Sequence, residues 1–245
     1  MYKKKSLGQH FLNSKVYLNA VADAAHIEEG ETVVEIGPGE GALTEVLLER
    51  GAKVIALEKD SRLISMLQEK FAGKDFTVME GDALEFEPKF KHYKVVGNIP
   101  YYITGALFKK FLTATQQPST LVFLVQKEVG ERIARSKKES ILSLSIKAYG
   151  TPKYIKTIPA GAFSPPPKVD SAIVAITNIS RSNFTNIAHE EKFFELVKKG
   201  FSQKRKFLKN NLGKEYSDLL EKVGISPKTR AEDVPLSKWI DLSRS

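Results

Sequence analysis

The sequence predicts an α/β protein with a doubly wound, mostly parallel sheet and a small all-helical C-terminal domain. Three observations lead to this prediction. Short runs rich in β-branched residues alternate with helical patterns over the first two-thirds of the chain, as they do in parallel βαβ units. These runs are almost continuously apolar, which is typical of strands covered on both faces. Beyond about residue 180 only helical patterns with charged faces remain.

The elements of the parallel sheet follow one another in chain order. Strands are expected at Thr32–Ile36, Lys53–Leu57, Phe76–Glu80, Lys94–Gly97 and Thr120–Gln126. Helices are expected between them at Ala42–Arg50, Ser61–Phe71 and Thr104–Leu112. Because strands that alternate with helices pair in parallel, their carboxyl ends meet at one edge, where such sheets bind ligands.

The pattern changes after the fifth strand. Two further strands, Tyr154–Pro159 and Ser171–Thr177, are joined by a Pro-rich loop and are expected to form an antiparallel edge. Helices are then expected near Glu190–Phe201, Gln203–Leu212, Tyr216–Val223 and Leu236–Ser243. The predicted domains are therefore residues 1–180 and residues 181–245.

Composition excludes several classes of protein. The 245 residues include no cysteine, which excludes disulfides, a thiolate nucleophile and a cysteine-based zinc site. The four histidines show no metal-ligand spacing, so no metal is expected. The basic N-terminus is followed by no apolar segment, and no apolar run is long enough to span a bilayer. We expect a cytoplasmic protein without a membrane partner, and a monomer.

Positive charge is concentrated towards the C-terminus. The formal net charge is +9, and residues 177–245 carry 14 of the 38 Lys and Arg residues but 9 of the 29 Asp and Glu residues. Basic surfaces favour polyanions, because neutralised phosphates release condensed counterions. A nucleic acid is therefore a candidate partner, and a solvated basic face is the alternative.

A glycine-rich turn follows the first strand. Its glycines, Gly37, Gly39 and Gly41, permit a tight turn and the close approach of a ligand to the backbone. The turn lacks the third glycine of the dinucleotide spacing, and Glu35 just before it suits a cationic amino acid group better than a pyrophosphate. Both details favour S-adenosylmethionine over NAD, in a Rossmann-like methyltransferase sheet.

Two more carboxylates are expected at the same edge. Glu58 closes the second strand, where a carboxylate can accept both ribose hydroxyls of a cofactor, although this position serves NAD equally well. Asp82 follows the third strand and is placed to accept the amino hydrogens of the cofactor's adenine. The alternatives are a solvated side chain at Glu58 and an ordinary turn residue at Asp82.

The four residues Asn98, Ile99, Pro100 and Tyr101 directly follow the fourth strand and resemble the N-x-P-Y motif of amino-methylating methyltransferases. An aryl amine is a poor nucleophile, because its lone pair is delocalised into the ring. The Asn98 side-chain oxygen and the Ile99 carbonyl can accept its two N–H bonds and favour a pyramidal nitrogen. Pro100 stiffens the turn, and Tyr101 offers a ring face to an extruded base. The alternative is a proline turn with a core tyrosine.

Two features outside these motifs are also candidate site residues. Phe163 begins the Pro-rich loop and is predicted to stack on the base from its other side, with ordinary packing as the alternative. A lysine-rich segment is predicted to form a phosphate-binding helix surface, with the N-terminal lysines as a second arm. The residues of this basic segment are Lys198, Lys199, Lys204, Arg205, Lys206 and Lys209, and those of the arm are Lys3, Lys4 and Lys5.

Several segments resemble the ribosomal RNA adenine dimethyltransferase family, and together they span nearly the whole chain. They are GQHFL at residues 8–12, NIPY at 98–101, FSPPPKVDSA at 163–172, FSQKRK at 201–206 with NNL at 210–212, and RAE at 230–232. Within the family they most resemble the type that acts on small-subunit RNA.

The resemblance implies an S-adenosylmethionine-dependent enzyme that dimethylates N6 of two adjacent adenines in the 3′-terminal hairpin loop of 16S rRNA. It implies a partner, the immature 30S subunit, and a role late in small-subunit assembly. It also implies that positions matching certain residues contact the cofactor. These are His10, Leu12, Gly37, Glu58, Asp82 and Asn98.

Other functions stay open at this point. Tyr102 stands where the small-subunit type usually has Asn, and it resembles the erythromycin-resistance relatives that modify 23S rRNA and confer macrolide resistance. A second alternative is a ribosome-assembly factor that acts mainly by binding. A third is an NAD-dependent enzyme, which Glu35 and Asn98 disfavour.

Overall fold

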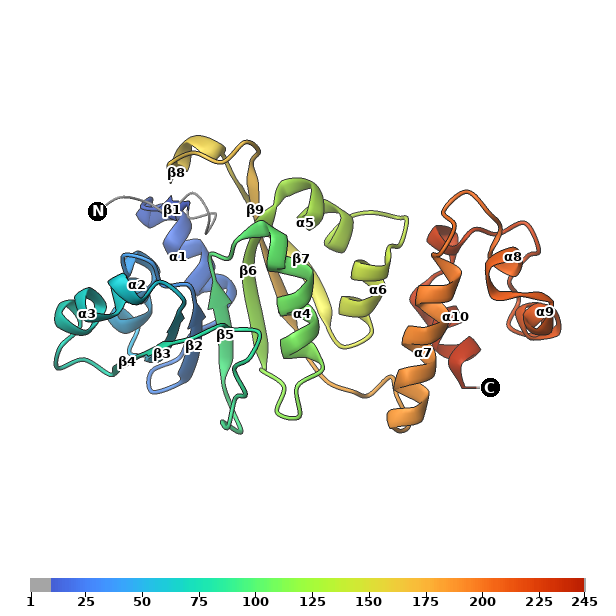
Figure 1. Ribbon diagram of the computed structural model, residues 1–245, viewed down its shortest axis with the longest axis horizontal. Helices are drawn as coiled ribbons and strands as arrows, with labels where there is room; N and C mark the ends of the chain where they lie inside the picture. The colour runs from blue at the N-terminus through green and yellow to red at the C-terminus, as the bar shows by residue number, and fades with distance from the viewer. Residues whose placement is uncertain (1–9, 245) are drawn as a thin grey trace. The chain divides into compact units, whose positions relative to one another are not determined.

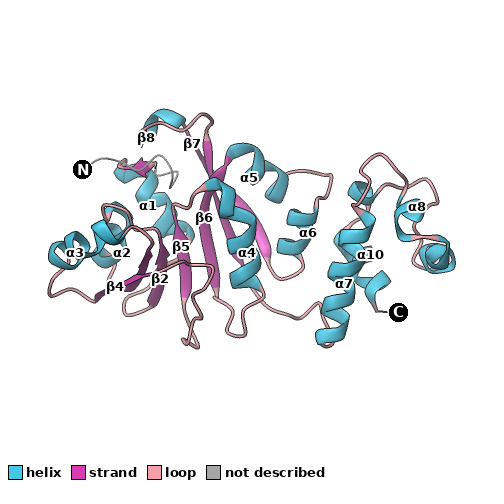
Figure 2. Ribbon diagram, in the orientation of Figure 1, coloured by secondary structure: helices cyan, strands magenta, loops and turns pink. Residues whose placement is uncertain are grey.

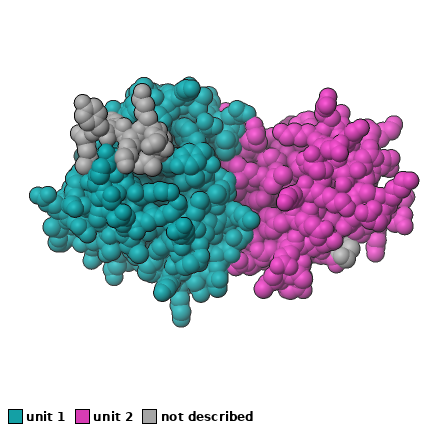
Figure 3. All heavy atoms as spheres, viewed as in Figure 1, with its two compact units in different colours: residues 1–130, 152–179 teal, residues 131–151, 180–245 magenta. Residues whose placement is uncertain are grey.

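The structure, a computed structural model, describes residues 10–244 and divides into two compact units (Figure 3). Unit 1 comprises residues 1–130 and 152–179, and unit 2 comprises residues 131–151 and 180–245. One junction between the units lies between Ile179 and Ser180. Residues 131–151 belong to unit 2, where their helix α6 (Ile141–Lys147) contacts helix α7 (Ile187–Gly200). The predicted domains, residues 1–180 and 181–245, stay a prediction.

Unit 1 is built on a seven-stranded sheet (Figures 1 and 2). In spatial order its strands are β4 (Phe76–Glu80), β3 (Lys53–Glu58), β2 (Thr32–Ile36), β5 (Lys94–Gly97), β6 (Thr120–Gln126), β9 (Ser171–Thr177) and β7 (Thr151–Ile158). The first five strands are parallel, and β9 is antiparallel to β6. The predicted α/β sheet is confirmed, and the two predicted edge strands are neighbours at one end of it.

The order of the sheet reverses at β2. The chain continues from β2 to β3 and β4 on one side, and β5 pairs with the other side of β2. Ile36 at the end of β2 is level with Leu57 of β3 and with Gly97 of β5. The carboxyl ends of these three strands therefore form a switch point, which is where doubly wound sheets bind ligands.

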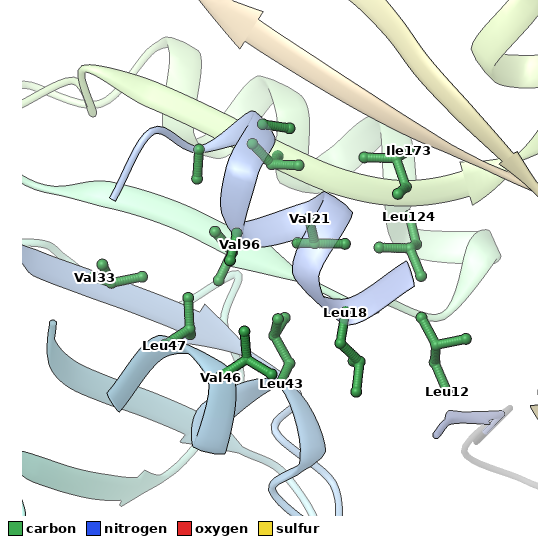
Figure 4. Packing of buried hydrophobic residues seen from close by; sticks show 14 of the residues in the cluster. Leu12, Leu18, Val21, Val33, Leu43, Val46, Leu47, Val96, Leu124 and Ile173 are labelled. Atoms are coloured by element: carbon green, nitrogen blue, oxygen red, sulfur yellow. The ribbon is translucent and has the colours of Figure 1, made fainter. Parts of the chain in front are cut away.

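Helices cover both faces of the sheet. On one face, helices α1 (Lys15–Ala24) and α2 (Ala42–Glu49) pack against alternate residues of the strands (Figure 4). The labelled members of this cluster are Leu12, Leu18, Val21, Val33, Leu43, Val46, Leu47, Val96, Leu124 and Ile173. On the other face, Phe108 and Phe111 of α4 (Thr104–Leu112) meet Phe123 edge-on, with ring centroids 5.3 and 6.5 Å apart. Alternate residues of a strand point to opposite faces, so burial on both sides explains the continuous apolar runs.

Four further elements accompany the sheet. Helix α3 (Ser61–Lys70) packs Leu63 and Leu67 against β4. Helix α5 (Lys127–Ala134) follows β6 and crosses from unit 1 into unit 2 after Gly130. Strands β1 (Phe11–Leu12) and β8 (Phe163–Ser164) form a separate antiparallel pair. This pair ties the Pro-rich loop to the segment that precedes α1.

Unit 2 is helical in its C-terminal part, as predicted. It contains α7, α8 (Leu208–Leu212), α9 (Ser217–Lys222) and α10 (Leu236–Ser243). The helix predicted at Gln203–Leu212 is wrong in its first half. Lys206 N donates to Gln203 O in a turn, and the extended backbone of Phe207 delays the helix until Leu208. None of the helices in the described part of the chain has the length and apolar character that crossing a membrane requires.

Candidate active site

A pocket of about 320 Å³ lies at the switch point of the sheet. It brings together predicted residues from five separate segments of unit 1. They are His10, Gly37, Gly39, Glu58, Asp82, Asn98, Ile99, Pro100 and Tyr101. The predicted residues Leu12, Glu35, Gly41 and Phe163 do not line this pocket.

The glycine turn leaves bare backbone at one wall of the pocket. Gly37, Gly39 and Gly41 have φ angles of +67°, +59° and +81°, a region that side-chain-bearing residues rarely adopt. A Cβ atom on Gly39 would lie 2.6 Å from Cε1 of Phe11. Gly41 supports the turn from outside the pocket, because its missing side chain makes room for Phe71 and it precedes α2.

We expect Gly39→Ala to weaken cofactor binding by at least about tenfold. A left-handed φ costs an L-residue about 1–2 kcal/mol, and the new methyl group must also displace the Phe11 ring, so the turn would reorganise. Gly73→Ala is the matched control, because Gly73 has a φ of +75° but open space around its missing side chain. Titration of each variant with S-adenosylmethionine measures the difference, and equal affinities would contradict the expectation.

Glu58 is fixed at the end of β3 by two backbone donors. Its Oε2 accepts from Gly39 N at 3.1 Å and its Oε1 accepts from Asp60 N at 2.9 Å. Burial raises the pKa of Glu58, and these backbone hydrogen bonds oppose the rise. Each carboxylate oxygen keeps further acceptor capacity, so the pocket presents an oriented acceptor for ligand hydroxyls.

Asp82 is held as a carboxylate on the neighbouring wall. Its Oδ2 lies 2.8 Å from Nζ of Lys59, and its Oδ1 accepts from Leu84 N at 2.9 Å. The hydrogen bond from Lys59 lowers the pKa of Asp82, and the bond from Leu84 adds to this. Asp82 therefore offers an ionised acceptor, which suits the amino group of an adenine.

Glu35 is buried beside the pocket instead of in it. Its Oε2 accepts from Thr44 Oγ1 at 2.6 Å, and the residue borders a second cavity of about 30 Å³ that Gly37 and Asn98 also line. Burial raises the pKa of Glu35 to about 7; the Thr44 hydrogen bond opposes this, and the charge of Glu58 adds to it. Glu35 can therefore gain or lose its proton near neutral pH.

The raised pKa of Glu35 makes the free energy of unfolding depend on pH. Between about 4.5 and about 7 the folded chain keeps the proton while the unfolded chain releases it, so stability falls as the pH rises. We expect Glu35→Gln to remove this fall, since an amide oxygen can still accept from Thr44. Urea unfolding at several pH values from 5 to 8 measures it.

Exposed Glu49 at the end of α2, the helix that also carries Thr44, supplies the control for this measurement. Glu49→Gln is expected to follow the wild-type pH curve. If the curves of wild type and Glu35→Gln run parallel across the whole range, the Glu35 side chain does not titrate as described.

The Asn98 amide has a defined orientation. Its Nδ2 donates to the His10 carbonyl at 2.8 Å. Because a carbonyl oxygen can only accept, the amide nitrogen faces His10 and the oxygen is turned to another side. Asn98 lines the pocket together with Ile99 and Pro100, so this acceptor stands at the head of the predicted motif.

The Tyr101 ring is held in the pocket wall. Its hydroxyl lies 2.7 Å from Ser171 Oγ, and its ring stacks on His10 with centroids 6.4 Å apart and an interplanar angle of 18°. Burial raises the pKa of Tyr101, so the hydroxyl stays protonated. His10 Nδ1 lies 2.8 Å from the Pro165 carbonyl, which requires a proton on that nitrogen.

Phe163 and Leu12 are placed in the core. Phe163 is 4% exposed and packs in the cluster that contains Leu12 and Leu18, and it is paired with Leu12 between β8 and β1. In this structure the Phe163 ring is buried among packing residues. Its stacking on the substrate, and a cofactor contact at Leu12, stay predictions.

Some pocket residues were not predicted as site residues. They include Phe11, Leu57, Lys59, Leu84 and Tyr102. A lysine after a strand or a tyrosine after an N-x-P-Y motif carries no signal of its own in one sequence. The sequence offers one indication for Lys59: it follows the strand next to the one that Asp82 follows.

The basic segment does not form one helix surface. Lys198 and Lys199 lie in the last turn of α7, and Lys209 lies in α8. Lys204, Arg205 and Lys206 lie in the turn between these two helices. All are exposed except Lys199, which is half-buried, lies 3.1 Å from Glu215 and faces the Tyr216 ring at 5.0 Å. The predicted arm at residues 3–5 lies outside the described residues.

The chain is similar to known proteins in sequence and in fold. The sequence model for ribosomal RNA adenine dimethylase matches residues 1–245. A relative in Dehalococcoides mccartyi named ribosomal RNA small subunit methyltransferase A is 42% identical over 96% of this chain and 86% of its own. A relative of the same name in Fusobacterium nucleatum is 39% identical over 98% and 96%.

Two solved structures share the fold. A dimethyladenosine transferase from Plasmodium falciparum has a TM-score of 0.84 and 28% identity, covering 95% of this chain and 96% of that one. The 23S rRNA methyltransferase ErmE has a TM-score of 0.81 and 26% identity, covering 96% and 98%.

Proposed function

The chain belongs to the ribosomal RNA adenine dimethylase family, and on this premise we propose that it dimethylates N6 of two adjacent adenines in the 3′-terminal hairpin loop of 16S rRNA. The observation that carries the proposal is the pocket wall formed by Asn98, Ile99, Pro100 and Tyr101 at the switch point of the sheet. This wall places an amide acceptor and a main-chain turn where a flat aryl amine can enter.

The donor and acceptor set of the pocket fits S-adenosylmethionine. Gly37 and Gly39 leave backbone exposed for close approach, Glu58 offers acceptors for ribose hydroxyls, and ionised Asp82 suits the adenine amino group. Glu35 borders the adjoining cavity and would carry a negative charge above about pH 7, which suits a cationic amino acid group. When bound, the cofactor supplies an electrophilic sulfonium methyl group.

Residues of the motif would activate the amine by orientation. Asn98 Oδ1 and the Ile99 carbonyl accept the two N–H bonds of the target amino group, which draws its lone pair out of the ring and aims it at the methyl donor. Tyr101 offers an apolar wall to the extruded base. The nitrogen that gains a methyl group releases one proton to water, because an alkylated aryl ammonium is strongly acidic.

The small-subunit substrate is favoured over 23S rRNA by the relatives. The chains that are 42% and 39% identical are named for the small subunit, whereas ErmE, named for 23S rRNA, is 26% identical. We propose that unit 2 forms an RNA-recognition domain through its basic segment. The partner would be an immature 30S subunit, bound in the cytoplasm by a monomer.

Labelled methyl transfer tests the proposal. The protein is incubated with methyl-labelled S-adenosylmethionine and either 30S or 50S particles that lack the modification, and the labelled nucleotides are mapped. We expect dimethyladenine at two adjacent positions of the 16S 3′-terminal loop. Label in 23S rRNA would replace the small-subunit substrate by the large-subunit one, and binding to 30S particles without label would favour an assembly factor.

A further inference from the structure

The mouth of the pocket carries an aromatic side chain that the proposed chemistry does not use. Tyr102 lines the pocket, yet its side chain is 73% exposed. A tyrosine ring presents large apolar faces at a small cost in conformational entropy, which suits a contact surface. The exposed ring is therefore available to a second part of the substrate.

The backbone beneath Tyr102 is held in place. Tyr102 is the middle residue of the 3₁₀ turn η2 (Tyr101–Ile103), which leads directly into α4. Ile103 N donates to Pro100 O at 3.2 Å, and the preceding Tyr101 is anchored on Ser171. The ring is consequently presented from a fixed point, which lowers the entropic cost of binding.

A cation lines the same pocket as this ring. Lys59 lines the same pocket and contacts Asp82. The hydrogen bond to Asp82 is the main reason why the pKa of Lys59 is raised, so Lys59 keeps its positive charge. A cation and an aromatic platform in the same site form the combination that binds single-stranded nucleic acid.

We propose that Tyr102 is the stacking platform for the nucleotide adjacent to the adenine held in the pocket. This rests on the proposed function, in which two neighbouring adenines are modified. One base at a time can face Asn98 within the pocket, so the neighbouring base remains at its mouth, where the Tyr102 ring is exposed. Stacking there would keep the loop engaged while one adenine replaces the other.

A double-mutant cycle tests this subsite. Wild type, Tyr102→Phe and Tyr102→Ala are compared on unmodified 30S particles that carry either both adenines or an abasic nucleotide in place of one of them. We expect Tyr102→Ala to lower kcat/KM by about tenfold on the adenine pair and by much less on the abasic particle, which has no base to stack. Tyr102→Phe keeps the ring and should retain nearly full activity on both.

Two controls separate this role from others. Val16→Ala removes an apolar side chain that is 63% exposed and outside the pocket, and its activity is expected to match wild type. Affinity for S-adenosylmethionine is measured for every variant and is expected to stay within about twofold of wild type, because the neighbouring base is not bound through the cofactor.

Three results would overturn the proposal. They are equal losses on both particles, a loss in Tyr102→Phe as large as in Tyr102→Ala, and a loss of cofactor affinity that accounts for the loss of activity. Failure of the proposed function is distinct, because wild type would then leave 16S rRNA unlabelled. In that case the same cycle, run at the neighbour of whichever base wild type labels, still tests the platform.

Discussion

Asn98→Ala is expected to lower the rate of methyl transfer by about 10²–10³-fold, the range seen when one oriented polar group is removed from a catalytic site. The variant loses the Oδ1 acceptor proposed to hold the target amino group. It also loses the donor that contacts the His10 carbonyl, so the position of the motif is less constrained. Single-turnover methyl transfer to 30S particles under saturating cofactor measures this loss.

The affinity of the Asn98→Ala variant for 30S particles distinguishes a role of Asn98 in methyl transfer from a role in RNA binding. We expect Asn98→Ala to bind 30S particles nearly as wild type does, because the substitution leaves the basic segment of unit 2 and the Tyr102 side chain unchanged. Gln68→Ala, which removes an exposed amide from α3, is the matched control and should keep full activity. If Asn98→Ala transferred methyl groups at the wild-type rate, the proposed orientation of the amine would be abandoned.

Trp239→Ala is expected to destabilise unit 2 by about 3–5 kcal/mol. Trp239 of α10 is fully buried and stacks on Phe201 with ring centroids 6.0 Å apart. It fills the space beside Gly200, where a Cβ atom would lie 2.4 Å from Cη2 of the indole. Within residues 10–244 its Nε1 forms no hydrogen bond, so the expected loss is one of packing.

This variant also separates the two proposed roles of the chain. Binding to 30S particles should weaken severely, whereas titration with S-adenosylmethionine should show a largely unchanged affinity, since the pocket is built from unit 1. Ser237→Ala, an exposed position of the same helix, is the control for both measurements. Unfolding with a wild-type midpoint in Trp239→Ala would contradict the packing described here.

Most of the sheet was predictable because burial on both faces leaves a direct mark on the sequence. The residues of β6, for example, are apolar almost throughout, and the glycine turn and the Asn98 motif follow strand ends. Helix α1 is not among the predicted helices, although its residues Leu18, Val21 and Ala22 have the spacing of an amphipathic helix. Its helical periodicity was thus readable, unlike the features that depend on distant contacts.

The burial of Phe163 and the turn before α8 arise from contacts between distant segments. Phe163 carries the same side chain whether it faces a base or the core, and its burial depends on pairing with Leu12, far away in the chain. The turn before α8 likewise depends on tertiary contacts, because Leu208 N donates to Thr229 O. Local patterns do not reveal such partners.

The pairing of β1 with β8 has a consequence for the newly made protein. Asn98 is held by the carbonyl of His10, and His10 in turn contacts Pro165, 155 positions further along the chain. During translation, the contact of His10 with Pro165 therefore forms only after the segment that contains Pro165 has left the ribosome, much later than His10 and Asn98. A nascent chain stalled before this segment is expected to be inert, so modification of RNA begins only after most of the polypeptide has been synthesised.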